Sequence, residues 1–234
     1  MATPVTARAH AFVDDLDAPV LSADDQRHFL RVLRLPLGSY ITVSDGHGTW
    51  RTCRLTSDPS LTVHGETVKD PAPNPPITVA FALVKGERPE LVVQKLTELG
   101  VDRIVPFVAD RSVVRWDAPK AERQTARLAQ IARQAAMQSR RTRLPEVGPM
   151  RTFHGAATLD GAALADPDGA PPTLERPAVL VGPEGGWSPE ERSAGLPSIR
   201  LGPHVLRAET AAITAGALLA ALRDGLVAHA DSAR

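Results

Sequence analysis

Short apolar runs, separated by longer amphipathic stretches, dominate the chain from residue 77 onward. The runs have the length and β-branched character of buried strands, and they cover residues 77–84, 101–108, 178–181 and 199–201. The amphipathic stretches carry apolar residues at helical spacing, and they cover residues 89–99, 118–140 and 208–222. A strand, a helix and a second strand in succession predict a parallel βαβ unit. We therefore expect an α/β domain with a parallel sheet.

A different pattern fills the first 70 residues, where β-type runs surround one amphipathic stretch. Strands are expected at residues 9–13, 40–44, 49–55 and 61–68. A helix is expected over residues 24–35, with Phe29, Leu30, Val32 and Leu33 on its apolar face. The sequence Asp-Gly-His-Gly at residues 45–48 predicts a hairpin turn. These features indicate a small β-rich domain.

Four prolines fall within residues 70–76 and predict a stiff, extended connector. We therefore expect a first domain at residues 1–70, a linker at 71–76 and a second domain at 77–234. Residues 152–176 alternate small apolar residues with turn formers, and no element is assigned to them.

The composition is typical of a soluble globular protein, because 43% of the residues are hydrophobic and no long low-complexity run occurs. The alanine-rich residues 208–222 come nearest to a membrane span, but charges bracket them and alanines suit close helix packing. The start of the chain lacks the pattern of a signal peptide. The single cysteine, Cys53, is expected to be a small buried hydrophobe. We expect a cytoplasmic protein that binds no membrane.

The net charge is zero, which at first argues against a nucleic-acid partner. The distribution of charge indicates otherwise, because residues 111–143 contain nine basic residues and only two acidic ones. A local basic stripe can engage phosphates whatever the total charge.

Two glycine-proline loops near the C-terminus are the strongest candidates for chemistry. One is Gly-Pro-Glu-Gly-Gly-Trp at residues 182–187, and the other is Gly-Pro-His-Val-Leu-Arg at residues 202–207. Each follows an expected strand and precedes a helix, the first helix opening on a capping box of Ser188 and Glu191. In an open α/β sheet, ligands bind beyond the carboxyl ends of strands, beside helix N-termini. The glycines suit either tight turns or a main chain that closes around a flat ligand such as adenosine.

Both loops, in this order and spacing and followed by Ala-Glu-Thr-Ala at residues 208–211, resemble the C-terminal signature of the RsmE family. Members of this family are 16S ribosomal RNA uridine-N3 methyltransferases of the SPOUT superfamily. Residues 28–34, 83–86, 94–101 and 134–141 resemble further family segments. The last segment departs from the family pattern at Met137, where glutamate is common, and this leaves any functional role of the position open.

The resemblance implies a SPOUT-type knotted α/β domain with a parallel sheet, preceded by a small PUA-like β-barrel that binds RNA. Its C-terminal trefoil knot would hold S-adenosylmethionine. The residues implied to cradle this cofactor through backbone groups are Gly182, Glu184, Gly185, Gly186, Leu201, Gly202, Val205 and Leu206.

Catalytic and RNA-binding residues are expected beside the cofactor loops and in the basic segments. Arg207 is expected to bind substrate phosphate or to stabilise charge on the uracil carbonyls, and Glu184 or Glu209 is expected to act as the base. Glu209 could equally be an acid placed favourably at a helix N-terminus. The residues expected to contact RNA are Arg31, Arg34, Lys85, Arg115, Arg140 and Arg141.

The implied partner is 16S ribosomal RNA within the 30S subunit, and SPOUT proteins generally form homodimers. No metal is expected, because the seven histidines are scattered without ligand spacing. Two alternatives stay open: another SPOUT RNA methyltransferase, acting on a ribose 2′-O or a tRNA base, and a non-catalytic RNA-binding protein. A dehydrogenase or a P-loop enzyme is disfavoured, because the sequence contains neither glycine motif.

Overall fold

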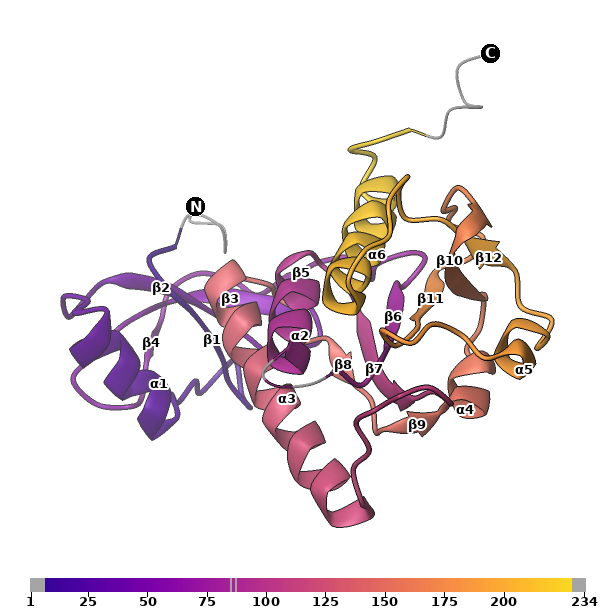
Figure 1. Cartoon of the computed structure of the whole chain (residues 1–234). Helices are drawn as coiled ribbons and strands as arrows, with labels where there is room; N and C mark the ends of the chain where they lie inside the picture. The colour runs from indigo at the N-terminus through magenta and orange to yellow at the C-terminus, as the bar shows by residue number, and fades with distance from the viewer. Residues whose placement is uncertain (1–6, 85, 87, 229–234) are drawn as a thin grey trace. The chain divides into compact units, whose positions relative to one another are not determined.

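The computed structural model of the chain describes residues 7–84, 86 and 88–228, which divide into two compact units (Figure 1). Unit 1 comprises residues 1–72 and 133–144, and unit 2 comprises residues 73–132 and 145–234. The proline-rich segment 70–76 therefore contains the first crossing between the units. Residues 133–144 belong to unit 1, whereas the sequence analysis assigned them to the second domain, 77–234.

Unit 1 is built on a five-stranded sheet in the order β1-β2-β3-β4, with β5 also paired to β3. The strands are β1 (His10–Phe12), β2 (Tyr40–Ser44), β3 (Thr49–Arg54), β4 (Thr62–Val63) and β5 (Val68–Lys69). β1 runs parallel to β2, and the other pairs are antiparallel. Ile41, Val43 and Cys53 are buried in its core, so the expectation for Cys53 is confirmed. The single strand expected at residues 61–68 is wrong, because Gly65, at a φ of 99°, turns the chain between β4 and β5.

The helix expected over residues 24–35 is only partly correct. α1 (Ala23–Arg27) begins at Ser22, whose hydroxyl accepts a hydrogen bond from the Asp25 amide at 3.1 Å. The chain then continues as a π-helical segment, η1 (His28–Val32), whose wider turn changes the direction in which successive side chains point. Phe29 is buried as expected, but Val32 and Leu33 are 65% and 45% exposed.

The last turns of α3 (Ala118–Ser139), with the residues that follow, are held in unit 1 by polar contacts. Arg133 Nη2 donates to Asp25 Oδ2 at 2.8 Å, and Thr142 Oγ1 donates to Asp70 Oδ2 at 2.6 Å. Met137 packs against the unit 1 core, and its sulfur lies 3.1 Å from Arg133 Nη1. Part of the basic segment thus serves the fold of unit 1.

Unit 2 is built on a seven-stranded parallel sheet in the order β12-β10-β11-β6-β7-β8, with β9 also paired to β7. The strands are β6 (Thr78–Ala82), β7 (Arg103–Val108), β8 (Glu146–Val147), β9 (Arg151–Thr152), β10 (Ala162–Ala170), β11 (Ala178–Val181) and β12 (Ser198–Ile199). α2 (Arg88–Glu98) connects β6 to β7. The expected α/β class and parallel βαβ unit are confirmed.

Alternate residues of the central strands point into two separate cores. On one face, Val79 and Phe81 pack with α2, α3 and α6 (Ala208–Arg223). On the other face, Ala80 and Phe107 pack with α4 (Phe153–Ala157) and Trp187. Figure 1 shows α6 between β6 and α2. Because both faces are covered, the strands are continuously apolar, which is the pattern that identified them in the sequence.

β10 is the longest of the elements that the sequence did not predict, which also include β8, β9 and α4. It lies between β11 and β12, and its pairing with β12 shifts register between Ala165 and Ala170. The irregular part contains Asp-Pro-Asp-Gly at residues 166–169, a sequence typical of a turn. A bulge accommodates these residues within the strand, and it brings Asp166 to the same sheet edge as the ends of β11 and β12.

Candidate active site

A cavity of about 470 Å³ lies at the carboxyl ends of β11 and β12 and beside the middle of β10. Its walls come from three segments: residues 165–167 of β10, residues 182–187, which we call loop A, and residues 201–207, which we call loop B. α5 (Pro189–Arg192) follows loop A, and α6 follows loop B. The two glycine-proline loops therefore meet at one site, as expected if they bind a common ligand.

Loop A is shaped by close contacts around its glycines. A Cβ on Gly182 would lie 3.0 Å from the indole ring of Trp187, so the main chain approaches this ring more closely than most side chains permit. Gly186 has a φ of 69°, which glycine adopts without strain. Trp187 is buried, and its Nε1 donates to the carbonyl of Ala165 at 3.0 Å. Trp187 thereby joins loop A to β10.

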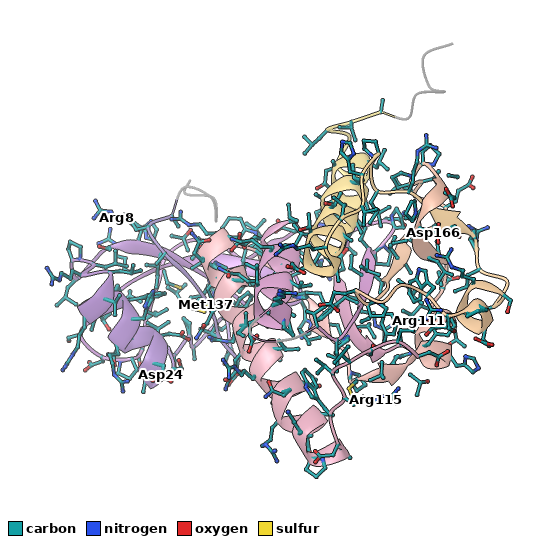
Figure 2. The ribbon with its side chains drawn as sticks, in the orientation of Figure 1. Arg8, Asp24, Arg111, Arg115, Met137 and Asp166 are labelled. Atoms are coloured by element: carbon teal, nitrogen blue, oxygen red, sulfur yellow. The ribbon has the colours of Figure 1, made fainter. Side chains whose placement is uncertain are left out.

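A hydrogen-bond network fixes the end of loop A. Ser188 caps α5, and the predicted capping box with Glu191 is confirmed. Ser188 Oγ donates to Asp110 Oδ2 at 2.6 Å, and Glu191 Oε1 accepts from the Asp110 amide at 2.9 Å. Arg111 Nη1 donates to the carbonyl of Gly185 at 3.1 Å. Figure 2 shows Arg111, in the segment after β7, and Asp166, on β10. The segment after β7 therefore holds loop A in place.

Loop B is more open than loop A. The side chain of Val205 is 90% exposed, Leu206 is half-buried, and Arg207 is exposed at the start of α6. Within the described residues, the Arg207 guanidinium forms no ion pair. A cation in this position is available for an anionic group of a ligand.

Opposite charges face each other across the cavity wall. Asp166, whose side chain is buried, forms an ion pair with Arg192, and both residues line the cavity. Glu184 also lines the cavity, and its Oε1 lies 3.3 Å from Nη1 of Arg88. The two acidic side chains of the wall therefore each have a cationic partner, whereas the positive charge of Arg207 has no anionic partner among the described residues.

The predicted cofactor residues are largely brought together. All of them line the cavity except Gly185, whose carbonyl is the acceptor for Arg111. Of the three catalytic candidates, Arg207 and Glu184 line the cavity. Glu209 is not among the lining residues, and its Oε1 lies 3.6 Å from Nε of Arg88. The structure thus separates the two glutamates that the sequence treated as equal candidates.

The predicted RNA-binding residues belong to both units. In unit 1, Arg31 and Arg34 are exposed, whereas the guanidinium of Arg140 donates to the carbonyls of Ala7 and Arg8. Arg141, also in unit 1, is half-buried. In unit 2, Arg115 is exposed and is labelled in Figure 2. Lys85 lies outside the described residues.

The sequence analysis did not predict Asp166 and Arg192, which form an ion pair in the cavity wall. It also did not predict that Trp187 connects loop A to β10. The apolar run at residues 162–165, directly after Gly161, was the available signal for a strand ending near Asp166. In the described part of the chain, no group of three or more His, Cys, Asp or Glu side chains could hold a metal ion. No helix there is long and apolar enough to cross a membrane.

Comparison with known families identifies both units. Residues 71–220 match the RNA methyltransferase domain, and residues 21–65 match the RNA methyltransferase PUA domain. The two matches together account for most of the chain.

Individual relatives match over nearly their whole length. Ribosomal RNA small subunit methyltransferase E of Mycobacterium tuberculosis is 33% identical over 218 residues, which cover 84% of this chain and 83% of that protein. The Bacillus subtilis protein of the same name is 30% identical, with 85% and 89% covered. The crystal structure of the Neisseria gonorrhoeae protein of this name, bound to S-adenosylmethionine, is 29% identical, with a TM-score of 0.75 and 92% and 97% covered.

Proposed function

The chain belongs to the family of small-subunit ribosomal RNA methyltransferases E, and on that premise we propose that it methylates N3 of one uridine in 16S ribosomal RNA. As a member of this family, it is a ribosomal RNA methyltransferase that uses S-adenosylmethionine. The position methylated, the roles of individual residues and the oligomeric state belong to the proposal.

One observation carries the proposal: the two glycine-proline loops meet at one cavity of about 470 Å³. This volume suits a ligand of nucleoside size. Apolar walls from Val181, Leu201 and Leu206 fit a flat ring, and a Cβ position on Gly202 has no neighbour within 4 Å, so its main chain is open to a ligand. The residues present therefore fit S-adenosylmethionine, with loops A and B as the segments that would hold it.

The chemistry at uracil N3 requires both a cation and a proton acceptor. N3 is an imide nitrogen that is protonated at neutral pH, so it becomes nucleophilic only as its proton leaves. Bound S-adenosylmethionine supplies the electrophilic methyl group. We assign Arg207 to stabilise the charge that develops on the uracil carbonyls, and Glu184 to accept the N3 proton. Both side chains line the cavity, which supports these roles over a catalytic role for Glu209.

RNA contacts are proposed on both units. Arg31 and Arg34 on unit 1 and Arg115 on unit 2 are exposed and can bind phosphates, which position the RNA without reading its sequence. Arg141 remains a proposed contact, while the internal hydrogen bonds of Arg140 favour a structural role. The target base must leave its stack to reach the cavity.

The family resemblance supports a trefoil knot around loops A and B and a homodimer that acts on the assembled 30S subunit in the cytoplasm. One feature of α6 supports the dimer. Ala212, Ala215 and Leu219 face the core, while Ile213, Ala217 and Leu218 are only half-buried, which leaves apolar surface that a second copy could cover.

The decisive experiment is methyl transfer from labelled S-adenosylmethionine to 30S particles that lack the modification, followed by identification of the modified nucleoside. We expect label in 3-methyluridine of 16S ribosomal RNA. A labelled 2′-O-methylnucleoside, or labelling of tRNA instead, would show a different methyltransferase of the same fold. Binding of 30S particles without transfer and without cofactor binding would show a non-catalytic RNA-binding protein.

A further inference from the structure

Arg88, the first residue of α2, faces two glutamates from distant parts of the sequence. Its Nη1 lies 3.3 Å from Oε1 of Glu184, and its Nε lies 3.6 Å from Oε1 of Glu209. Glu184 belongs to loop A, and Glu209 lies in the first turn of α6, directly after loop B. One guanidinium therefore joins the two segments that form the cavity.

The contact with Glu209 is the more buried of the two. The Glu209 side chain is 13% exposed, compared with 43% for Glu184. Oε2 of Glu209 is buried and has no hydrogen-bond partner among the described residues. A buried carboxylate with an unsatisfied oxygen is costly, and a neighbouring cation lowers that cost. Arg88 is the ion-pair partner that the structure provides for Glu209.

Arg88 can affect the charge at the cavity without contributing to the cavity wall. Glu184 lines the cavity, but Arg88 does not. The other acidic residue of the wall, Asp166, has its own partner in Arg192. Removal of the Arg88 charge would therefore leave the wall in place, with the negative charge of Glu184 uncompensated at the cavity and that of Glu209 uncompensated outside its lining. Such a charge attracts a cationic ligand more strongly than a neutral ligand of similar shape.

We propose that Arg88 is a positioning residue that acts through Glu184 and Glu209. It holds loop A to the start of α6, and it offsets part of the charge of Glu184 so that the cavity does not overstabilise the positively charged methyl donor. Excess binding of the donor would oppose turnover, because its positive charge disappears as the methyl group leaves. The inference rests on the proposed function.

The test compares calorimetric titrations with S-adenosylmethionine, which is cationic at sulfur, and S-adenosylhomocysteine, which is neutral there. We expect Arg88→Met to shift the ratio of the two affinities toward S-adenosylmethionine by about three- to tenfold. Arg88→Lys should keep the ratio within about twofold of the wild type, since it keeps the charge. Glu184→Gln removes a negative charge from the cavity wall while Arg88 keeps Glu209 as a partner, so it should shift the ratio in the opposite direction.

A matched control is available in an ion pair between α3 and the same helix, α2. Arg127 Nη2 lies 3.3 Å from Oε1 of Glu90, the α2 residue two positions after Arg88, and neither residue lines the cavity. Arg127→Met removes a comparable ion pair at α2, and we expect it to retain the wild-type ratio.

Three results would overturn the inference. One is an equal change in both affinities for Arg88→Met, which would indicate a structural contact alone. Another is a shift that Arg88→Lys fails to restore. The third is a Glu184→Gln variant with the wild-type ratio, and this test remains if Arg88→Met does not fold. Failure of the wild type to bind either ligand would instead refute the proposed function itself, and with it this inference.

Discussion

Arg207 stands where loop B becomes α6, exposed and beside the cavity. We expect Arg207→Ala to lower kcat/KM for methyl transfer to 30S particles by at least about a hundredfold, the scale of losing a group that stabilises developing charge. Stability should change by no more than about 0.5 kcal/mol, because the side chain packs on little. Steady-state kinetics and urea unfolding measure the two effects.

Arg200→Ala is the matched control for this prediction, because Arg200 is exposed just before loop B and does not line the cavity. It should retain wild-type transfer. Near wild-type turnover by Arg207→Ala would remove Arg207 from the proposed mechanism.

His10 in β1 makes the stability of unit 1 depend on pH. Burial lowers the pKa of His10 from 6.5 to about 4, and the neighbouring Arg140 and Arg133 also lower it. The folded state therefore binds fewer protons than the unfolded state between these values, so stability falls as pH falls from about 6.5 to about 4. The shift corresponds to a loss of about 3 kcal/mol in the free energy of unfolding, measurable by urea unfolding across this range.

His10→Gln removes the titrating group, and we expect it to flatten this part of the pH profile even if it lowers stability at pH 7. His28→Gln, at an exposed position of η1, is the control and should preserve the slope. An unchanged slope in His10→Gln would assign the acid sensitivity to other groups.

The sequence analysis identified the functional residues of the motifs, but it did not predict which side chains contact each other in the folded protein. The glycines of loop A and the cation Arg207 were recognised from their motifs, and the structure brings them to one cavity. Glu184 and Glu209 were not distinguished, because the feature that distinguishes them, the lining of the cavity by Glu184 alone, depends on how distant segments fold together. Asp166 was missed for a similar reason, since its partner Arg192 belongs to another element.

At the scale of elements, the pairing of β10 with β12 positions the start of loop B. A Cβ on Gly169 would lie 2.5 Å from backbone atoms of Ser198 and Ile199, too close for either strand to remain in place. We expect Gly169→Ala to destabilise the protein by about 1–3 kcal/mol and to weaken S-adenosylmethionine binding, because β12 leads directly into loop B. Thermal unfolding and calorimetry measure the two effects.

Gly155→Ala in α4 provides the comparison, because a Cβ there would lie 3.6 Å from its nearest neighbours, an ordinary van der Waals contact. Alanine favours helix over glycine, so this variant should be neutral or slightly more stable. If the two alanine variants had the same stability and the same affinity for S-adenosylmethionine, the close contact between β10 and β12 at Gly169 would not constrain loop B.

The elements with strong periodicity were predicted well, and the exceptions have physical causes. α2, α6, β2 and β11 lie close to their predicted positions because each buries a continuous apolar face. η1 departs from the expected helix because periodicity cannot distinguish an α-helical turn from a π-helical turn over so few residues. β10 was missed because its bulged half contains turn-forming residues.

At the scale of the whole molecule, the net charge is zero, but the basic residues fall into two groups: those that stabilise the fold and those that are exposed. Within unit 1, Arg133 pairs with Asp25, while Arg143 donates to the carbonyls of His47 and Asp70. The exposed Arg31 and Arg115 remain available for RNA. Counting charges along the sequence could not separate these groups, because the residues that pair with Arg133 and Arg143 come from the first 70 residues.

The central claim is that loops A and B together form the site of the methyl donor. A crystal structure of the protein with S-adenosylmethionine tests it most directly. The account predicts density for the whole ligand in the cavity between residues 182–187 and 201–207, with Glu184 still paired to Arg88. Density for the ligand at any other place, or a cavity closed by packed side chains while the ligand binds elsewhere, would contradict the account.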